Sequence, residues 1–150
     1  MATEKHFNSS IYRPITMEDD IKRMLSTHNS LRQIDIWWFG FLIGVTKTTF
    51  EEADLSSNFS SKINDTASQI LDDERILMIE SVFLNECGLE QQYDFTGLPA
   101  NIIKFAHGYA YPGMQELKSK FNTIGNLDAA FFKALGQAGK DPDATELILG

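Results

Sequence analysis

The stretch IDIWWFGFLIGV at residues 34 to 45 constrains the fold more than any other part of this chain. After Asp35 it contains ten consecutive apolar or glycine residues, whereas a membrane-spanning helix needs about twenty. We therefore expect that it does not enter a membrane. The side chains of ten successive helical residues point in every direction around the axis. The sequence therefore predicts a helix that is either central in the bundle or half covered by another chain.

Two features of this stretch bear on what covers it. Gly40 and Gly44 form a GxxxG pattern, which lets another helix approach closely. Trp37 and Phe39 lie off the main apolar stripe, so they would be the exposed residues if the helix meets a partner. A homodimer that shares this helix is one alternative, and burial within a single chain is the other.

Helical periodicity dominates the rest of the sequence. Apolar residues recur three and four positions apart, and residues 36 to 45 are the one segment that could instead be read as a buried strand. We predict an all-α fold, a compact single-domain bundle of five to seven helices. In this interpretation residues 1 to 15 form an irregular N-terminal arm, and residues 16 to 150 form a single helical domain.

Capping and stop signals place the helix ends. Thr16 and Asp19 resemble a capping box, and the helix that starts there either continues to about residue 48 or breaks near Asn29. Each later helix has a Ser, Asn, Pro or Gly signal at one end. Five later helices are predicted. The first carries Phe59 to Leu71 after a cap at Ser56, Ser57 or Asn58, and the second covers about 73 to 87. The third runs from Pro99 and is ended by Pro112 and Gly113, the fourth carries Met114 to Ile124, and the fifth carries Leu127 to Ala138 after a cap at Asn126.

Acidic charge is concentrated in the middle of the chain. The net charge is −8, and residues 51 to 100 hold eleven acidic and two basic groups. Nucleic-acid binding depends on lysines and arginines that replace counterions, so we expect no nucleic-acid partner. A local acidic surface favours a basic protein partner, because complementary charge speeds association. The residues predicted to form this surface are Glu51, Glu52, Asp54, Asp72, Asp73, Glu74, Glu86, Glu90 and Asp94.

The cysteine content and the first residues indicate the cellular setting. Cys87 is the only cysteine, so neither an intramolecular disulfide nor a thiolate metal cage can form. The first fourteen residues contain no apolar segment of the kind that a secretory signal needs. Both observations favour a cytoplasmic protein.

Few residues are candidates for chemistry. Glu80 has apolar neighbours at helical spacing, which a paired carboxylate or a functional acid would explain. The three histidines form no HExxH or Glu-x-x-His pattern, and the sequence contains no phosphate-binding glycine loop or nucleophile motif. We therefore expect no metal and no cofactor, and enzyme activity is the minority hypothesis.

Three functions fit these observations. The first is an inhibitor module, an immunity or antitoxin-type protein that neutralises a basic partner such as a nuclease toxin through the acidic surface of residues 51 to 94. The second is a helical small-molecule binding or sensing domain. Its pocket, which is also the candidate oligomer surface, would be formed by Trp37, Trp38, Phe39, His107 and Tyr109. The third is an all-α metal-dependent nucleotide pyrophosphohydrolase in which two acidic pairs, Glu51 with Asp54 and Glu86 with Glu90, bind magnesium.

Overall fold

A computed structural model describes residues 11–28, 30–63, 72–85 and 98–138. Within these ranges the chain forms five α-helices and one small sheet, so the predicted all-α bundle is confirmed. No helix in the described ranges is long and apolar enough to cross a membrane. The elements are β1 (Tyr12–Pro14), the 3-10 helix η1 (Ile15–Met17), α2 (Glu18–Leu25), α3 (Gln33–Lys47), β2 (Ser60–Lys62), α4 (Asp73–Phe83), α5 (Leu98–Ile124) and α6 (Leu127–Ala138).

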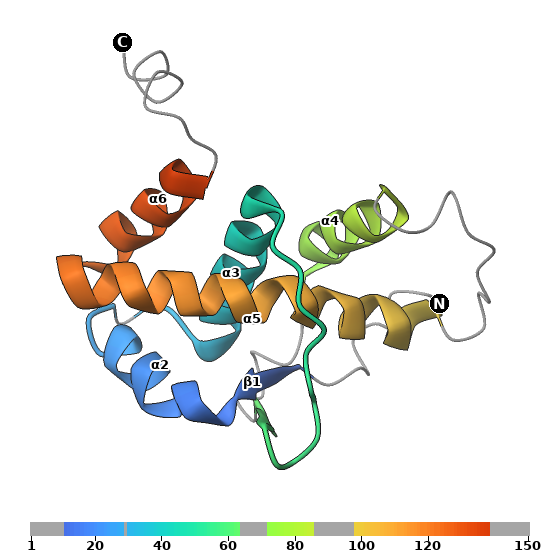
Figure 1. Cartoon of the computed structure of the whole chain (residues 1–150), viewed down its shortest axis with the longest axis horizontal. Helices are drawn as coiled ribbons and strands as arrows, with labels where there is room; N and C mark the ends of the chain where they lie inside the picture. The colour runs from blue at the N-terminus through green and yellow to red at the C-terminus, as the bar shows by residue number, and fades with distance from the viewer. Residues whose placement is uncertain (1–10, 29, 64–71, 86–97, 139–150) are drawn as a thin grey trace, which may run out of the picture.

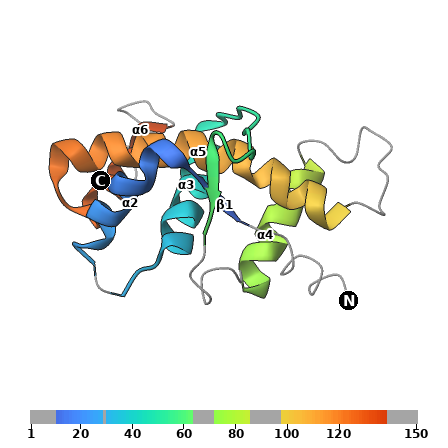
Figure 2. The same cartoon turned by 90° about the horizontal axis from the view of Figure 1, so that it is seen from below.

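The long helix α5 is the axis of the molecule (Figure 1). Helix α3 crosses behind it in this view, and α3 and α5 share the most extensive contact between any two elements described. Helices α2 and α6 lie on opposite sides of α5, and α4 packs near its first turns (Figure 1). Seen from below, α2 and the sheet lie in front of α5 (Figure 2). The hydrophobic core therefore gathers around the crossing of α3 and α5.

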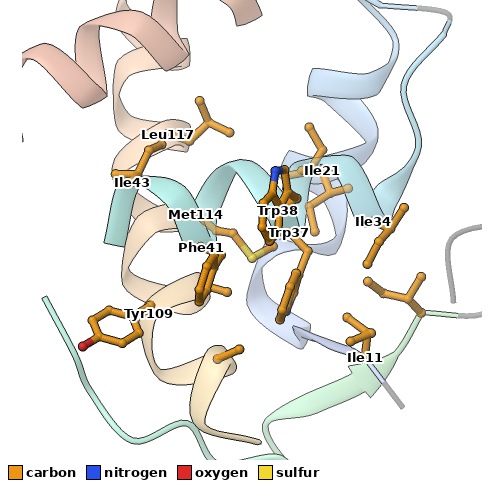
Figure 3. Close-up of a cluster of buried hydrophobic side chains, with 14 of the residues drawn as sticks. Ile11, Ile21, Ile34, Trp37, Trp38, Phe41, Ile43, Tyr109, Met114 and Leu117 are labelled. Carbon is orange, nitrogen blue, oxygen red and sulfur yellow. The ribbon is translucent and has the colours of Figure 1, made fainter. Parts of the chain in front are cut away.

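Glycines bring the backbones of α3 and α5 into direct contact. A Cβ atom added to Gly113 would lie less than 3.0 Å from the Gly40 carbonyl group, and one added to Gly44 would meet the Tyr109 carbonyl in the same way. The GxxxG pattern of α3 therefore serves close packing within one chain. Around this contact Trp37 is fully buried. Figure 3 shows the tryptophans of α3 near Met114 of α5, and Leu117 near Ile43.

Helix α5 continues through Pro112, so the prediction that Pro112 and Gly113 end a helix is wrong. Proline has no backbone N–H and cannot bond the carbonyl four residues earlier, which here belongs to Gly108. The backbone N–H of Glu51 donates to that carbonyl instead, at 3.0 Å. A segment distant in sequence thus satisfies the acceptor that the proline leaves open.

The segment between residues 16 and 48 forms two helices, which settles the alternative that the sequence left open. Helix α2 ends at Leu25 and α3 begins at Gln33. The predicted capping box at Thr16 is wrong, because Thr16 lies in η1 and the residue before α2, Met17, makes no side-chain cap. A tight 3-10 turn leads directly into the helix and takes the place of a side-chain cap.

The helix predicted to start near Phe59 is also wrong over the residues described. Ser60–Lys62 is strand β2, which pairs antiparallel with β1 so that Tyr12 faces Lys62. One further bond, from the Ile63 N–H to the Ile11 carbonyl, extends this ladder, and both isoleucines are buried. Pairing with a distant strand has overridden the weak helical pattern. The predicted irregular arm therefore contains a strand at its end, while residues 64–71 lie outside the described ranges.

Two predicted helix starts are confirmed. The Asn126 side chain accepts the Ala129 N–H at 2.9 Å at the beginning of α6, as expected for an N-cap. Helix α4 starts at Asp73 as predicted, and the structure describes it as far as Phe83.

Replacing Gly113 by alanine tests the α3 to α5 contact. We expect Gly113→Ala to lower the free energy of unfolding by about 2 kcal/mol or more, because the added methyl group meets backbone atoms that cannot move aside. The matched control is Gly136→Ala in α6, where an added Cβ meets nothing within 4 Å. This control should raise stability by about 0.5–1 kcal/mol through helix propensity. Urea denaturation followed by circular dichroism measures both, and equal effects would contradict the glycine contact.

Candidate functional site

The candidate site is the loop FEEADLSSNF at residues 50–59, here called the acidic loop. It connects α3 to β2 and runs across α5 (Figure 1). Glu51, Glu52 and Asp54 are all exposed in it. The loop therefore presents three of the predicted partner-binding carboxylates together.

The loop is fixed to the helical core at both ends. At its start the Phe50 ring packs 5.3 Å from the Phe105 ring and 5.1 Å from the Tyr109 ring, measured between centroids. It also lies against Gly108, where a Cβ atom would collide with it. At its end the Ser60 hydroxyl donates to the Asp54 carbonyl at 2.6 Å. The carboxylates are thus held on a defined backbone.

Asp54 has a local partner that keeps it ionised. Its carboxylate accepts the backbone N–H of Ser56 at 2.9 Å, the geometry of an Asx turn. Hydrogen bonds from Ser56 lower the pKa of Asp54 below its ordinary value. A carboxylate that accepts such bonds is stabilised in its charged form, so Asp54 is negative at neutral pH.

An open depression of about 520 Å³ lies beside these carboxylates. Two large apolar side chains at the ends of the same loop are also exposed, Phe50 at 47% and Phe59 at 61%. Ile15 is 38% exposed, and its N–H donates to the carbonyl of Phe59, so these two residues are neighbours. The surface thus combines an acidic centre with exposed aromatic side chains at both ends of the loop. The lining residues of the depression are Glu52, Ala53, Asp54, Leu55, Ser56 and Lys104.

The described part of the predicted acidic surface divides into two groups. The acidic loop follows the C-terminal end of α3, whereas Asp72 and Glu74 lie at the start of α4. Arg75 joins this start to the N-terminal end of α3 through an ion pair with Asp35 at 3.3 Å. The fifteen residues of α3 span about 22 Å, so these two groups do not form one patch. The side chain of Asp73 and the residues Glu86, Glu90 and Asp94 lie outside the described residues.

Asp72 has a structural role. Its carboxylate accepts the Arg75 N–H at 2.8 Å and so caps α4. The Arg75 guanidinium also lies 5.2 Å from the ring centroid of Trp38, which adds a cation-π contact between α4 and α3. Arg75 therefore links α4 to α3.

The residues predicted to form a pocket or an oligomer surface are largely core. Trp37, Trp38, His107 and Tyr109 are buried, and Figure 3 shows the two tryptophans near Met114 while Tyr109 points away from them on the other side of α5. Phe39 is half-buried against Phe131 of α6, with ring centroids 4.8 Å apart. The apolar stretch of α3 is therefore covered by its own chain.

His107 uses both ring nitrogens inside this core. Its Nδ1 lies 2.8 Å from the Ile103 carbonyl oxygen, which can only accept, so Nδ1 carries the proton. Its Nε2 then accepts the backbone N–H of Tyr12 at 2.9 Å. Burial lowers the pKa of His107 from 6.5 to about 4 against the opposing effect of the Ile103 bond. The imidazole is thus neutral at pH 7 and joins β1 to α5.

The acidic pair that magnesium chemistry would use does not lie on a helix. Glu51 and Asp54 belong to the acidic loop, where no third ligand joins them. Among the described residues, no group of three or more His, Cys, Asp or Glu side chains could hold a metal ion. The second predicted pair, Glu86 with Glu90, lies outside the described ranges.

Comparison with known proteins assigns no function to this site. No protein-family model, curated protein or solved structure matches the chain. The site can therefore be interpreted only from its own residues. Three of these, Phe50, Phe59 and Lys104, were not predicted as site residues. The exposure of Phe59 could have been predicted, because a phenylalanine within a polar segment has few apolar neighbours that could bury it.

Substitution of Asp72 tests its role as a helix cap. We expect Asp72→Ala to lower the free energy of unfolding by about 1 kcal/mol, the usual cost of losing an N-cap. Asp72→Asn should cost much less, since asparagine also accepts the capping bond. Thermal denaturation of the three proteins measures the difference, and equal losses in both variants would show that charge rather than capping matters at this position.

Proposed function

We propose that the protein is a protein-binding module of the inhibitor or immunity type, which neutralises a basic partner such as a nuclease toxin through its acidic loop. The observation that carries the proposal is the arrangement of Glu51, Glu52 and Asp54 between Phe50 and Phe59 on a loop that is fixed to the core. A cationic site on the partner would be covered by the carboxylates, and the phenylalanines would contact its rim.

Physical properties of the loop support this use. Opposite charges raise the rate of association and fix orientation, while buried aromatic side chains supply much of the affinity of protein interfaces. The anchors at Gly108 and Ser60 hold the backbone before binding. A loop that is already ordered loses less conformational entropy when it binds.

The small-molecule alternative receives less support from the geometry. A typical small-molecule site encloses most of the ligand surface in an apolar pocket. Here four of the five residues proposed for such a pocket are buried in the core, where Trp37 packs against His107 and Phe41. The depression by the acidic loop is open. A broad partner surface fits this shape better than an enclosed ligand.

Neutralising two carboxylates of the loop tests the proposal. The protein, immobilised on resin, is exposed to extracts of its own cells, and bound proteins are quantified by mass spectrometry. We expect basic proteins to be enriched and to elute as salt is added, because ion pairing at an exposed surface is screened. Glu51→Gln with Glu52→Gln should reduce the retained amount about tenfold or more, which corresponds to about 1.4 kcal/mol.

The matched control is Glu74→Gln with Asp128→Asn, which removes the same charge from two exposed sites on α4 and α6. It should retain the partner nearly as well as the unaltered protein. Phe59→Ser, which leaves the charge unchanged, should also weaken retention. Equal losses in the loop variant and the control would mean that bulk charge, and not the acidic loop, drives binding.

A further inference from the structure

We infer that the β1–β2 sheet is an acid-sensitive latch on α5, held by the neutral imidazole of His107 and released when that imidazole takes up a proton. The sheet here means β1 and β2 together with the flanking residues Ile11 and Ile63. This inference concerns the fold and does not depend on the proposed function.

The first link between the sheet and α5 is the bond from the Tyr12 N–H to Nε2 of His107. Backbone groups of a strand alternate in direction, and the bonds made by Ile11 and Ile15 show that odd-numbered residues of β1 face β2. The backbone N–H of Tyr12 therefore points away from β2. Pro14, the next residue in the same orientation, has no N–H. His107 thus holds the outward-facing donor of β1.

A second link lies one turn further along α5. The hydroxyl groups of Ser60 in β2 and Tyr111 in α5 are 2.8 Å apart. Burial raises the pKa of Tyr111 to about 12, so this phenol keeps its proton throughout the acidic range. The link through His107 therefore responds to acid, and the link through Tyr111 does not.

Protonation would turn the His107 bond into a repulsion. A charged imidazole donates from both nitrogens, so two donors would face each other where Nε2 now accepts the Tyr12 N–H. Among the described residues, the titratable groups facing the ring are Tyr12 of β1, with centroids 6.0 Å apart, and Tyr111 of α5, at 5.7 Å. Trp37 faces it from α3 at 5.3 Å. None of these three side chains is a carboxylate that could stabilise the cation.

The pH window follows from the two states of His107. Folded, it stays neutral down to about pH 4, whereas the exposed imidazole of an opened state takes up a proton below about 6.5. The stability that the neutral imidazole contributes is therefore complete above pH 6.5 and is lost as the pH falls towards 4.

A carboxylate also holds the sheet, and it titrates in a lower range. Glu18 accepts bonds from the Ser61 hydroxyl and the Arg13 guanidinium, which lower its pKa below the ordinary 4.5. Between pH 6.5 and 4.5 the loss of stability of the sheet is therefore caused by protonation of His107 and not of Glu18.

Release should be local because the two regions are held differently. The described part of the sheet pairs three residues on each strand, whereas α3 and α5 are joined by the glycine contact and by most of the buried side chains. Elements with few buried contacts open at lower free energy than the core. Ser60 would move with the sheet and loosen its hold on Asp54.

Amide hydrogen exchange measured by NMR between pH 7 and 4.5 tests the latch. Exchange is expressed as protection factors, which remove the intrinsic pH dependence of exchange. The factors of Arg13 and Ile63 should fall about tenfold per pH unit below about pH 6, as expected when opening is coupled to the uptake of one proton. The protection factors of Leu117 and Phe121, which lie in α5 more than two turns beyond His107, should stay unchanged over this range.

His107→Gln removes the titrating group while leaving an oxygen that can accept the Tyr12 N–H, and it should abolish the pH dependence. The control, His6→Gln with His28→Gln, removes the other two histidines and should leave it intact. Should His107→Gln fail to fold, the imidazole signals of His107 in the unaltered protein provide a second measurement. Opening of the sheet while His107 stays neutral, or only together with loss of protection at Leu117 and Phe121, would overturn the latch.

Discussion

The direct backbone contact between α3 and α5 is the constraint on which the rest of the structure depends. Gly40, Gly44 and Gly113 leave no space for a side chain at the crossing, so the large apolar residues of α3 must pack on either side of it. This explains why ten successive apolar or glycine residues can be covered within one chain. Close approach of two helices also increases the number of atoms in dispersion contact, which offsets the low helix propensity of glycine.

Apolar spacing and capping residues predicted those helices that depend mainly on residues within the same segment. The helical class of the fold followed from the spacing of apolar residues, and the start of α6 followed from Asn126. The strand pair could not be predicted in this way, because Tyr12 and Lys62 are distant in sequence and neither segment shows alternation. The same holds for Pro112, which looked like a helix end because the donor that compensates for it, the Glu51 N–H, is brought there only by the fold.

The candidate site was predicted in part. Charge counting located the acidic segment, and the exposure of Glu51, Glu52 and Asp54 follows the general rule that charged side chains stay in water. Counting could not distinguish these from Asp72, which has similar neighbours in sequence but caps a helix. The position of His107 among aromatic residues suggested a pocket, yet only the tertiary structure shows that its two nitrogens already have partners within the chain.

The attachment of the acidic loop has one further consequence. The loop is held by the amide of Glu51, the carbonyl of Asp54 and the ring of Phe50, and none of these contacts involves the carboxylates of Glu51 or Glu52. These contacts therefore do not depend on which side chains occupy positions 51 and 52. Such a loop can change what it recognises through substitutions that leave its own backbone in place, so that specificity and folding are free to vary independently.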